Sequence, residues 1–322
     1  MPIVWIIAGL LTLILGAELI VRGGTRVAAR LGIPPILIGL TIVSVGTSTP
    51  ELAIGIEAAV RGNGSLAVGN IAGTNTVNLL LIFGLSALLR PLVVSARTVR
   101  FDLPAMTFVA VGFMVMAWDG LLTRTDGAVM VFGGFAYTIA IIYLSKREGR
   151  SIQAEFAREF AGDKSRASNA SALWGSLALI AGISIVVVGS DWLVDGSVAL
   201  ARKIGISEAL IGLTIVAIGT SSPELVTTIV GTLRNDRDIA IGNLLGSSIY
   251  NILAILGITC LIPAVPLTVE PALLAIDIPV MTVATLACIP LFVTDRRVSR
   301  IEGGLLVALY LIYLLYLVIV RV

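Results

Sequence analysis

Two copies of one short motif place a proline and a carboxylate in the middle of apolar sequence. The motif Gly-Thr-Ser-x-Pro-Glu occupies 46–51 and returns at 219–224, and the apolar runs around it, 34–60 and 206–233, contain no Lys or Arg. An ionised carboxylate at the centre of a membrane helix costs about 2.5–3.5 kcal/mol. Glu51 and Glu224 therefore need a counter-charge from a mobile cation or a proton, which predicts an ion-transport site.

The composition predicts an all-α polytopic membrane protein. The chain of 322 residues is 57% hydrophobic and 13% charged, with mean hydropathy +1.03, whereas soluble domains are about 45–50% apolar and about 25% charged. There is no His, and Cys260 and Cys288 lie apart in apolar segments, so zinc, haem and Cys/His catalysis lack their groups. We expect the lipid bilayer as partner, with no cofactor, no enzymatic activity, no nucleic acid and no obligatory protein partner.

The hydropathy pattern divides the chain into ten membrane segments. They are expected at 2–22, 34–60, 65–89, 102–118, 127–145, 172–201, 206–233, 238–262, 271–293 and 301–320. The first is interpreted as a transmembrane helix and not a cleaved signal peptide, because it lacks a basic leading region. The long hydrophilic loop, 146–171, is either a short interfacial helix or a solvated linker.

An internal repeat relates the two halves of the chain at an offset of 173 residues. The run 37–43 matches 210–216, and Gly69-Asn70 matches Gly242-Asn243. This predicts a first five-helix repeat at 1–145 with its motif region at 32–89, a linker at 146–171, and a second repeat at 172–322 with its motif region at 205–262. The second and seventh helices are expected to break at the prolines.

The distribution of basic residues predicts how the repeats sit in the membrane. Each repeat has five spans, so the second must enter from the opposite side. Seventeen of the 22 Lys and Arg residues fall in loops on one side, which makes that side, with the central loop, cytoplasmic and both termini external in a plasma (inner) membrane. Inverted repeats with broken helices at the midplane are typical of secondary transporters.

The proline breaks favour cation binding at the ends of the half-helices. Pro50 and Pro223 lack an N–H, so the carbonyls of Gly46 and Gly219 lose their helical partners and are expected to face a cation. The alternative is structural: Ser48 and Ser221 stand three residues before Glu51 and Glu224, the spacing of a capping box.

Polar residues on the third and eighth spans would form the other wall of the site. Asn70, Thr74 and Asn78 lie four residues apart, and their counterparts in the second half are Asn243, Ser247 and Asn251. Together with the two carboxylates they offer only hard oxygen ligands, which suits Ca²⁺ better than Mg²⁺ and is also open to Na⁺. Hydrogen bonding between helices is the alternative interpretation of these residues.

These motifs resemble the two α-repeats of the sodium/calcium exchanger family, within the Ca²⁺/cation antiporter superfamily, in its prokaryotic form. The resemblance implies Na⁺/Ca²⁺ antiport by alternating access, with Ca²⁺ and Na⁺ as transported ions. It implies the following ligands: Glu51, Glu224, Thr47, Thr220, the carbonyls of Ser44 and Ala217, and the side chains of Ser48, Ser221, Thr74, Ser247, Asn78 and Asn251. Some members carry Asp at the position of Asn251, so this chain has two titratable ligands, which one Ca²⁺ would neutralise.

Three other functions are weighed against this one. A proton-coupled Ca²⁺/cation exchanger would use the same carboxylates by protonating them. An intramembrane hydrolase is disfavoured, because two acids without a nucleophile and a base beside them do not form a hydrolytic site. An ion channel would be distinguished from an exchanger by its much faster ion flux, seen as single-channel currents.

The remaining acidic residues are interpreted as structural. Glu18 and Glu57 each precede an arginine by four residues and are expected to pair with it. Asp102, Asp126, Asp277 and Glu302 are expected as helix caps or membrane-interface residues.

Overall fold

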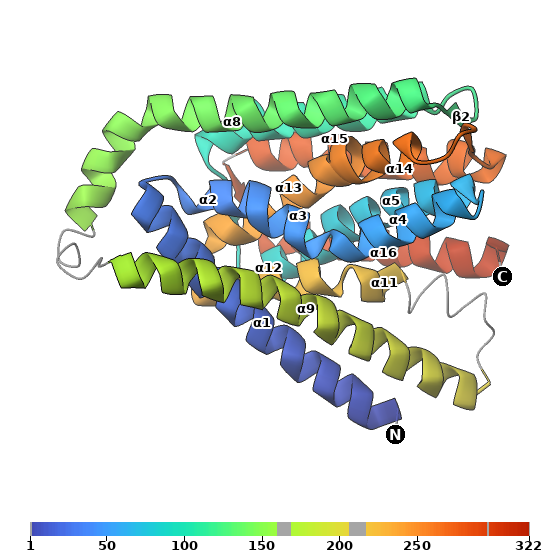
Figure 1. The fold of residues 1–322 in the computed structure, drawn as a ribbon, viewed down its shortest axis with the longest axis horizontal. Coiled ribbons are helices and arrows are strands. Elements are labelled where there is room, and N and C mark those ends of the chain that lie inside the picture. The colour runs from blue at the N-terminus through green and yellow to red at the C-terminus, as the bar shows by residue number, and fades with distance from the viewer. Residues whose placement is uncertain (1, 160–168, 206–216, 295, 322) are drawn as a thin grey trace.

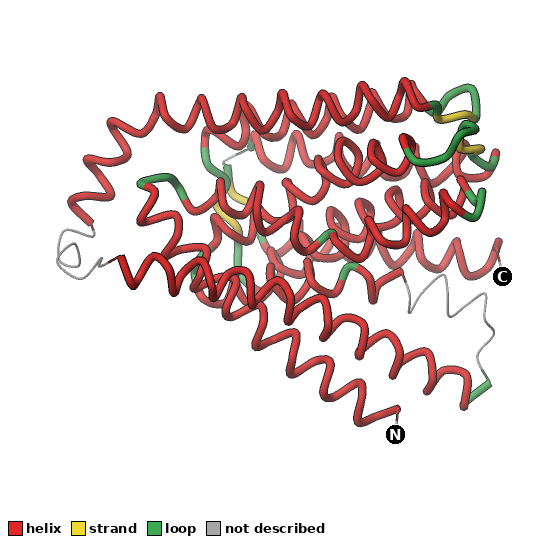
Figure 2. The backbone as a smooth tube through the Cα atoms, in the orientation of Figure 1, coloured by secondary structure: helices red, strands yellow, loops and turns green. Residues whose placement is uncertain are grey.

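The computed structural model describes residues 2–159, 169–205, 217–294 and 296–321. These residues form long helices that run roughly along the longest axis of the molecule (Figure 1), with two short strand pairs as the exception to helix (Figure 2). The prediction of an all-α membrane protein is confirmed.

Several helices of both halves contain π-helical turns, here labelled η. The first half forms α1 (Pro2–Leu31), α2 (Pro35–Ile38), η1 (Gly39–Val43), α3 (Ser44–Thr47), α4 (Thr49–Val60), α5 (Gly64–Thr76), η2 (Val77–Ile82), α6 (Phe83–Leu89), β1 (Leu92–Val93), η3 (Thr98–Asp102), α7 (Leu103–Met116), β2 (Leu121–Leu122) and α8 (Arg124–Glu159). The second half forms α9 (Asn169–Lys203), α11 (Ala217–Thr220), α12 (Ser222–Arg234), α13 (Arg237–Tyr250), η6 (Asn251–Leu256), α14 (Gly257–Leu261), β3 (Leu267–Thr268), η7 (Leu273–Asp277), α15 (Ile278–Val293), β4 (Arg297–Val298) and α16 (Arg300–Arg321).

Eight helical stretches among the described residues are long and apolar enough to cross a membrane. A ninth is the pair Pro35–Thr47 and Thr49–Val60, which bends by 44° at its break. The tenth expected span, 206–233, is described only from Ala217 onward, where it too is interrupted, at Ser221. Both predicted breaks are present in the backbone.

Two short antiparallel strand pairs tie loops that are distant in sequence. β1 pairs with β4, with Leu92 opposite Val298, and β2 pairs with β3, with Leu122 opposite Leu267. The loop after α6 therefore lies at the same end of the molecule as the loop after α15, and the loop after α7 lies with the loop after α14. The expected order of spans requires the same grouping of loops.

A seam of glycines joins α1 to α9, which runs antiparallel to it. Gly9, Gly16 and Gly23 recur every seven residues, and a Cβ atom on Gly16 would stand 2.9 Å from the carbonyl oxygen of Gly182. Gly9 faces Gly189 and Gly23 faces Gly175 at similar distances. Small residues let membrane helices approach to backbone contact, where packing provides the attraction that the hydrophobic effect does not.

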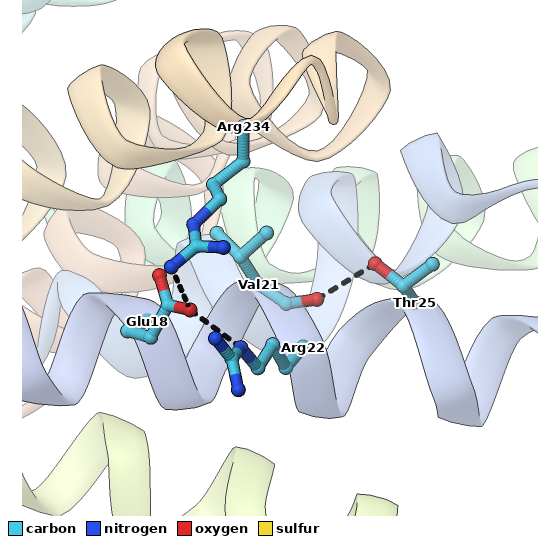
Figure 3. Close-up of polar contacts among 5 residues, drawn as sticks. All are labelled: Glu18, Val21, Arg22, Thr25 and Arg234. Atoms are coloured by element: carbon cyan, nitrogen blue, oxygen red, sulfur yellow. Dashed lines mark hydrogen bonds and ion pairs between the residues drawn. The ribbon is translucent and has the colours of Figure 1, made fainter.

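Glu18 links α1 to the end of α12. Its carboxylate lies 2.5 Å from Arg22 and also 2.5 Å from Arg234 (Figure 3). The predicted pair with Arg22 is confirmed, whereas the second partner lies on another helix. Nearby, the Thr25 hydroxyl donates to the carbonyl of Val21 within α1.

Three other acidic residues predicted to be structural make local contacts. Glu57 pairs with Arg61 at 2.6 Å, as predicted. Asp126 and Glu302 close capping boxes: each accepts a backbone N–H from the residue three positions earlier, Thr123 and Ser299, at 2.8 and 2.7 Å.

The prediction that the side chains of Asp102 and Asp277 cap helices is wrong, and the alternative that they are membrane-interface residues stays a prediction. Both are buried, and neither makes a side-chain capping bond to its helix. Instead they accept hydrogen bonds from Tyr137, at 3.3 Å, and Tyr313, at 2.5 Å. A buried carboxylate needs such a donor because its desolvation is otherwise uncompensated.

The segment predicted as a linker, 146–171, begins as a continuation of a membrane helix. The backbone of α8 is helical to Glu159, and α9 begins at Asn169. Residues 160–168 lie outside the described part, so neither interpretation of the loop is decided over its whole length.

Candidate cation site

The two broken helices have nearly the same backbone at their breaks. Ser48 has φ −81° and ψ 13°, and Ser221 has φ −84° and ψ 5°. In each case a proline follows at the second position of the next helix, where its missing N–H costs little. Repetition of one backbone geometry in both halves places Glu51 and Glu224 in the first turns of α4 and α12.

The carbonyls freed by the prolines are not left without partners, because nearby hydroxyls donate to them. The Thr49 hydroxyl donates to the carbonyl of Gly46 at 2.7 Å. The carbonyl of Gly219 receives the hydroxyls of Ser222, at 2.6 Å, and Ser190, at 2.9 Å. Hydroxyls that bond backwards along a helix thus satisfy both carbonyls locally.

The capping-box alternative for Ser48 and Ser221 does not hold. Neither serine makes a side-chain bond to its own helix. The Ser48 hydroxyl donates to Oε1 of Glu224, in the other half of the chain, at 3.1 Å. The Ser247 hydroxyl lies 3.5 Å from the same oxygen and 3.4 Å from the Ser48 hydroxyl. Each half of the molecule therefore contributes to the surroundings of Glu224.

Glu51 is less well satisfied than Glu224. Both of its carboxylate oxygens are buried without a hydrogen bond, and so is the Ser221 hydroxyl. Thr74 lies beside Glu51, and Glu224 is near enough for the two charges to repel each other. Among the described residues, no Lys or Arg forms an ion pair with either carboxylate. Two buried carboxylates near each other require a positive charge to offset their desolvation and mutual repulsion.

The ligand-bearing parts of the third and eighth spans lie at transitions from α- to π-helix. Asn78 lies in η2, directly after α5, and Asn251 is the first residue of η6, directly after α13. Wide turns of this kind often occur at functional sites. Both amide atoms of Asn78 and the Oδ1 of Asn251 are buried without partners.

Asn70 and Asn243 form hydrogen bonds between helices, the kind of contact that the alternative interpretation predicted. Asn70 donates to the backbone carbonyl of Glu51 at 3.4 Å. Asn243 donates to Thr228 at 3.3 Å and accepts the Thr47 hydroxyl at 3.2 Å. They join the ligand-bearing helices to one another.

Threonines and carbonyls flank the carboxylates on the helices before the breaks. The Ser44 carbonyl accepts the backbone N–H of Ser48 at 3.1 Å and lies 3.3 Å from the Thr47 hydroxyl. Thr220 ends α11, buried at the position equivalent to Thr47. Ala217 is the first residue of α11, so its carbonyl belongs to the same helical turn.

The structure gathers the predicted ligands into the buried interior. The side chains that are fully or almost fully buried are those of Ser44, Thr47, Ser48, Glu51, Thr74, Asn78, Thr220, Ser221, Glu224, Ser247 and Asn251. Five of them retain an oxygen without a hydrogen-bond partner: Glu51, Glu224, Asn78, Asn251 and Ser221. Buried polar atoms are ordinarily satisfied, so these unsatisfied oxygens are candidate ligands for a cation.

Sequence reasoning missed Asn75 and Ser248, which lie between these ligands. Asn75 donates to the backbone carbonyl of Ser248 at 3.0 Å and accepts from Asn251 at 3.1 Å. The two residues are separated by the repeat offset of 173, a signal that the sequence carried. Asn75 and Ser248 directly follow Thr74 and Ser247, so they do not belong to the rows of polar residues spaced four apart.

Membrane-spanning helices around an oxygen-rich interior, with two broken helices meeting there, define a polytopic cation transporter. The chain belongs to the sodium/calcium exchanger family, whose family model (sodium/calcium exchanger protein) matches residues 1–144 and 174–319. This family consists of exchangers and is not a class of enzymes.

Two named relatives align with nearly the whole chain. The chain is 35% identical to the putative antiporter CaxA of Alkalimonas amylolytica, over 96% of both chains. It is 31% identical to the sodium/calcium exchanger MaX1 of Methanosarcina acetivorans, over 97% of both. The fold matches that of the sodium–calcium exchanger NCX_Mj soaked with Na⁺ and Sr²⁺, with TM-score 0.83 and 27% identity over 97% of both chains. The chain is thus a cation/Ca²⁺ antiporter by family and fold.

Proposed function

We propose that this protein exchanges Na⁺ for Ca²⁺ across the plasma membrane by alternating access. The two five-helix repeats, 1–145 and 172–322, would open the site to one side and then to the other. Na⁺ moving down its gradient would drive Ca²⁺ in the opposite direction, with both ions as substrates and no further cofactor or protein partner required.

The observation that carries the proposal is the set of buried oxygens without partners. Glu51 and Glu224 supply two negative charges, and Asn78, Asn251 and Ser221 supply neutral oxygens. Desolvating two carboxylates is expensive unless an opposite charge joins them. One Ca²⁺ would balance both charges, and Na⁺ ions would do the same in a larger number.

The chemistry of the ligands favours Ca²⁺ and Na⁺ over other metals. All candidate ligands are hard oxygens; no thiolate or imidazole is among them. Ca²⁺ takes 6–8 oxygens in flexible geometry, whereas Mg²⁺ demands an octahedron and retains water. The carbonyls of Ser44 and Ala217 and the hydroxyls of Thr47 and Thr220 would complete the shell around the carboxylates, with Ser48, Thr74 and Ser247.

The membrane orientation is part of the proposal. The loops that carry most of the basic residues would lie in the cytoplasm, with both termini outside. The strand pairs support this order, because they hold together loops that the order assigns to one side.

Ion flux in sealed vesicles tests the proposal. Purified protein is reconstituted, the vesicles are loaded with Na⁺ at clamped pH, and ⁴⁵Ca²⁺ uptake is followed after dilution into Na⁺-free medium. Uptake that requires the Na⁺ gradient supports the proposal. Uptake that follows an imposed pH gradient and ignores Na⁺ would contradict it in favour of proton coupling, in which Glu51 and Glu224 exchange protons for the metal.

A further inference from the structure

We infer that Asn75 is a positioning residue that fixes the orientation of the Asn251 amide and presents its oxygen to the transported cation. This inference rests on the proposed function, because it concerns a ligand of the same site. It assigns a role to a residue that binds no ion itself.

The orientation of the Asn75 side-chain amide follows from its hydrogen bond to the backbone carbonyl of Ser248. The backbone carbonyl of Ser248 can only accept a hydrogen bond, so the group that faces it at 3.0 Å must be the amide nitrogen of Asn75. Asn75 is buried, with 2% of its surface exposed, and water does not compete for this bond. The Oδ1 of Asn75 is thereby directed away from Ser248.

Asn75 in turn fixes the orientation of the Asn251 side-chain amide. The Oδ1 of Asn75 lies 3.1 Å from the side-chain nitrogen of Asn251, which donates to it. The opposite rotamer of Asn251 would set two oxygens against each other. The Oδ1 of Asn251 therefore points elsewhere, and there it is buried and without a partner. Two successive amides thus leave one acceptor free for a cation.

Ser248, the residue equivalent to Asn75 in the other half, does not orient Asn78 in the same way. The repeat offset relates Asn75 to Ser248 and Asn78 to Asn251. The Ser248 hydroxyl donates to the carbonyl of Leu244 in its own helix, at 2.9 Å. It does not hold Asn78, and both amide atoms of Asn78 are without partners. The Asn251 amide is thus oriented by a hydrogen bond to its neighbour, whereas no such bond orients the Asn78 amide.

The same bond explains why position 251 suits an amide. An ionised Asp at this position would place a carboxylate oxygen against the Oδ1 of Asn75, and Asn75 could not turn without losing its bond to Ser248. Asn75 thereby keeps the site at two carboxylates, Glu51 and Glu224. A charge of minus two matches one Ca²⁺.

A double-mutant cycle on Ca²⁺ affinity tests the inference. Equilibrium dialysis with ⁴⁵Ca²⁺ is performed on the full chain in detergent, up to tens of millimolar Ca²⁺. We expect Asn75→Ala to weaken Ca²⁺ binding about tenfold in the wild type and in Asn78→Ala, and to have no further effect in Asn251→Ala. Equal weakening in all backgrounds, or no weakening in the wild type, would overturn the inference.

Matched variants separate positioning from damage to the fold. Thr76→Ala removes a hydroxyl that is equally buried but bonds to Ala72 in its own helix, at 2.8 Å. This variant should bind Ca²⁺ as the wild type does. If Asn75→Ala does not fold, Asn75→Ser, whose hydroxyl is too short to reach Asn251, enters the same cycle with the same criteria.

The controls also distinguish this inference from the proposed function. If the wild type and Glu51→Gln bind Ca²⁺ equally, the cation site itself is misassigned. If Glu51→Gln abolishes binding while Asn75→Ala acts equally in every background, only the role of Asn75 fails.

Discussion

The Ser48 hydroxyl donates to the Glu224 carboxylate at 3.1 Å, across a separation of 176 residues. This bond joins the break in one half of the chain to the acidic residue of the other. Its counterpart is not made in the same way, because the Ser221 hydroxyl and both oxygens of Glu51 are without partners. The site is thus symmetric in its residues and asymmetric in its bonds.

Ser48→Ala should weaken Ca²⁺ binding about tenfold. The hydroxyl gives its hydrogen to Glu224 and keeps lone pairs for a cation, so its loss removes an orienting bond and a ligand, together about 1–2 kcal/mol. Thr49→Ala is the matched control. Its hydroxyl bonds only to the Gly46 carbonyl, so we expect lower thermal stability, by about 1 kcal/mol, with unchanged Ca²⁺ affinity. Similar affinity losses in both variants would show that the break, and not the hydroxyl, matters.

Gly16→Ala should destabilise the protein by about 1–3 kcal/mol. The added Cβ would meet the backbone of α9, 2.9 Å from the Gly182 carbonyl oxygen, and backbone atoms cannot turn aside. Gly112→Ala, on α7, is the control, since no described atom outside the adjoining backbone of its own helix lies within 4 Å of its added Cβ. Thermal unfolding in detergent, followed by fluorescence, measures both. Equal melting temperatures for the two variants would contradict the close contact between α1 and α9.

Asp236 should make the protein less stable as pH rises through its titration range. This residue precedes α13, in the loop beside Arg234, and burial raises the pKa of its carboxyl above the ordinary value of 3.8. The Thr25 hydroxyl and Arg234 act in the opposite direction, and Glu18 adds to the effect of burial. The folded state therefore binds more protons than the unfolded state between the ordinary and the raised value, and stability falls with rising pH across that window.

Asp236→Asn should lose this pH dependence. Its amide cannot ionise, so thermal stability across the window should change less with pH than in the wild type. A slope unchanged by Asp236→Asn would assign the effect to another group.

The sequence predicted the membrane helices and both helix breaks for identifiable reasons. Long apolar runs determine membrane helices. The absence of Lys and Arg from the apolar runs around Glu51 and Glu224 can be read directly from the sequence. Pairs four residues apart, such as Glu18 with Arg22, follow from helix geometry alone.

The features that sequence reasoning missed depend on contacts across the chain or on small local rearrangements. Arg234 reaches Glu18 from another helix, and no local pattern joins them. The Gly46 carbonyl was expected to lack a hydrogen-bond partner, yet it accepts the hydroxyl of Thr49, three residues later. Asn75 directly follows Thr74 and lies off the row of polar residues four apart, and its bonds to Ser248 and Asn251 reach across to the other half of the chain.

The central claim is that Glu51 and Glu224 are neutralised together by one transported cation. Equilibrium dialysis of purified protein with ⁴⁵Ca²⁺ tests it most directly, using wild type, Glu51→Gln, Glu224→Gln and the control Glu57→Gln. We predict one Ca²⁺ bound per chain for wild type and Glu57→Gln, and none for either site variant at the same concentration. Undiminished binding in Glu51→Gln or Glu224→Gln would contradict the account.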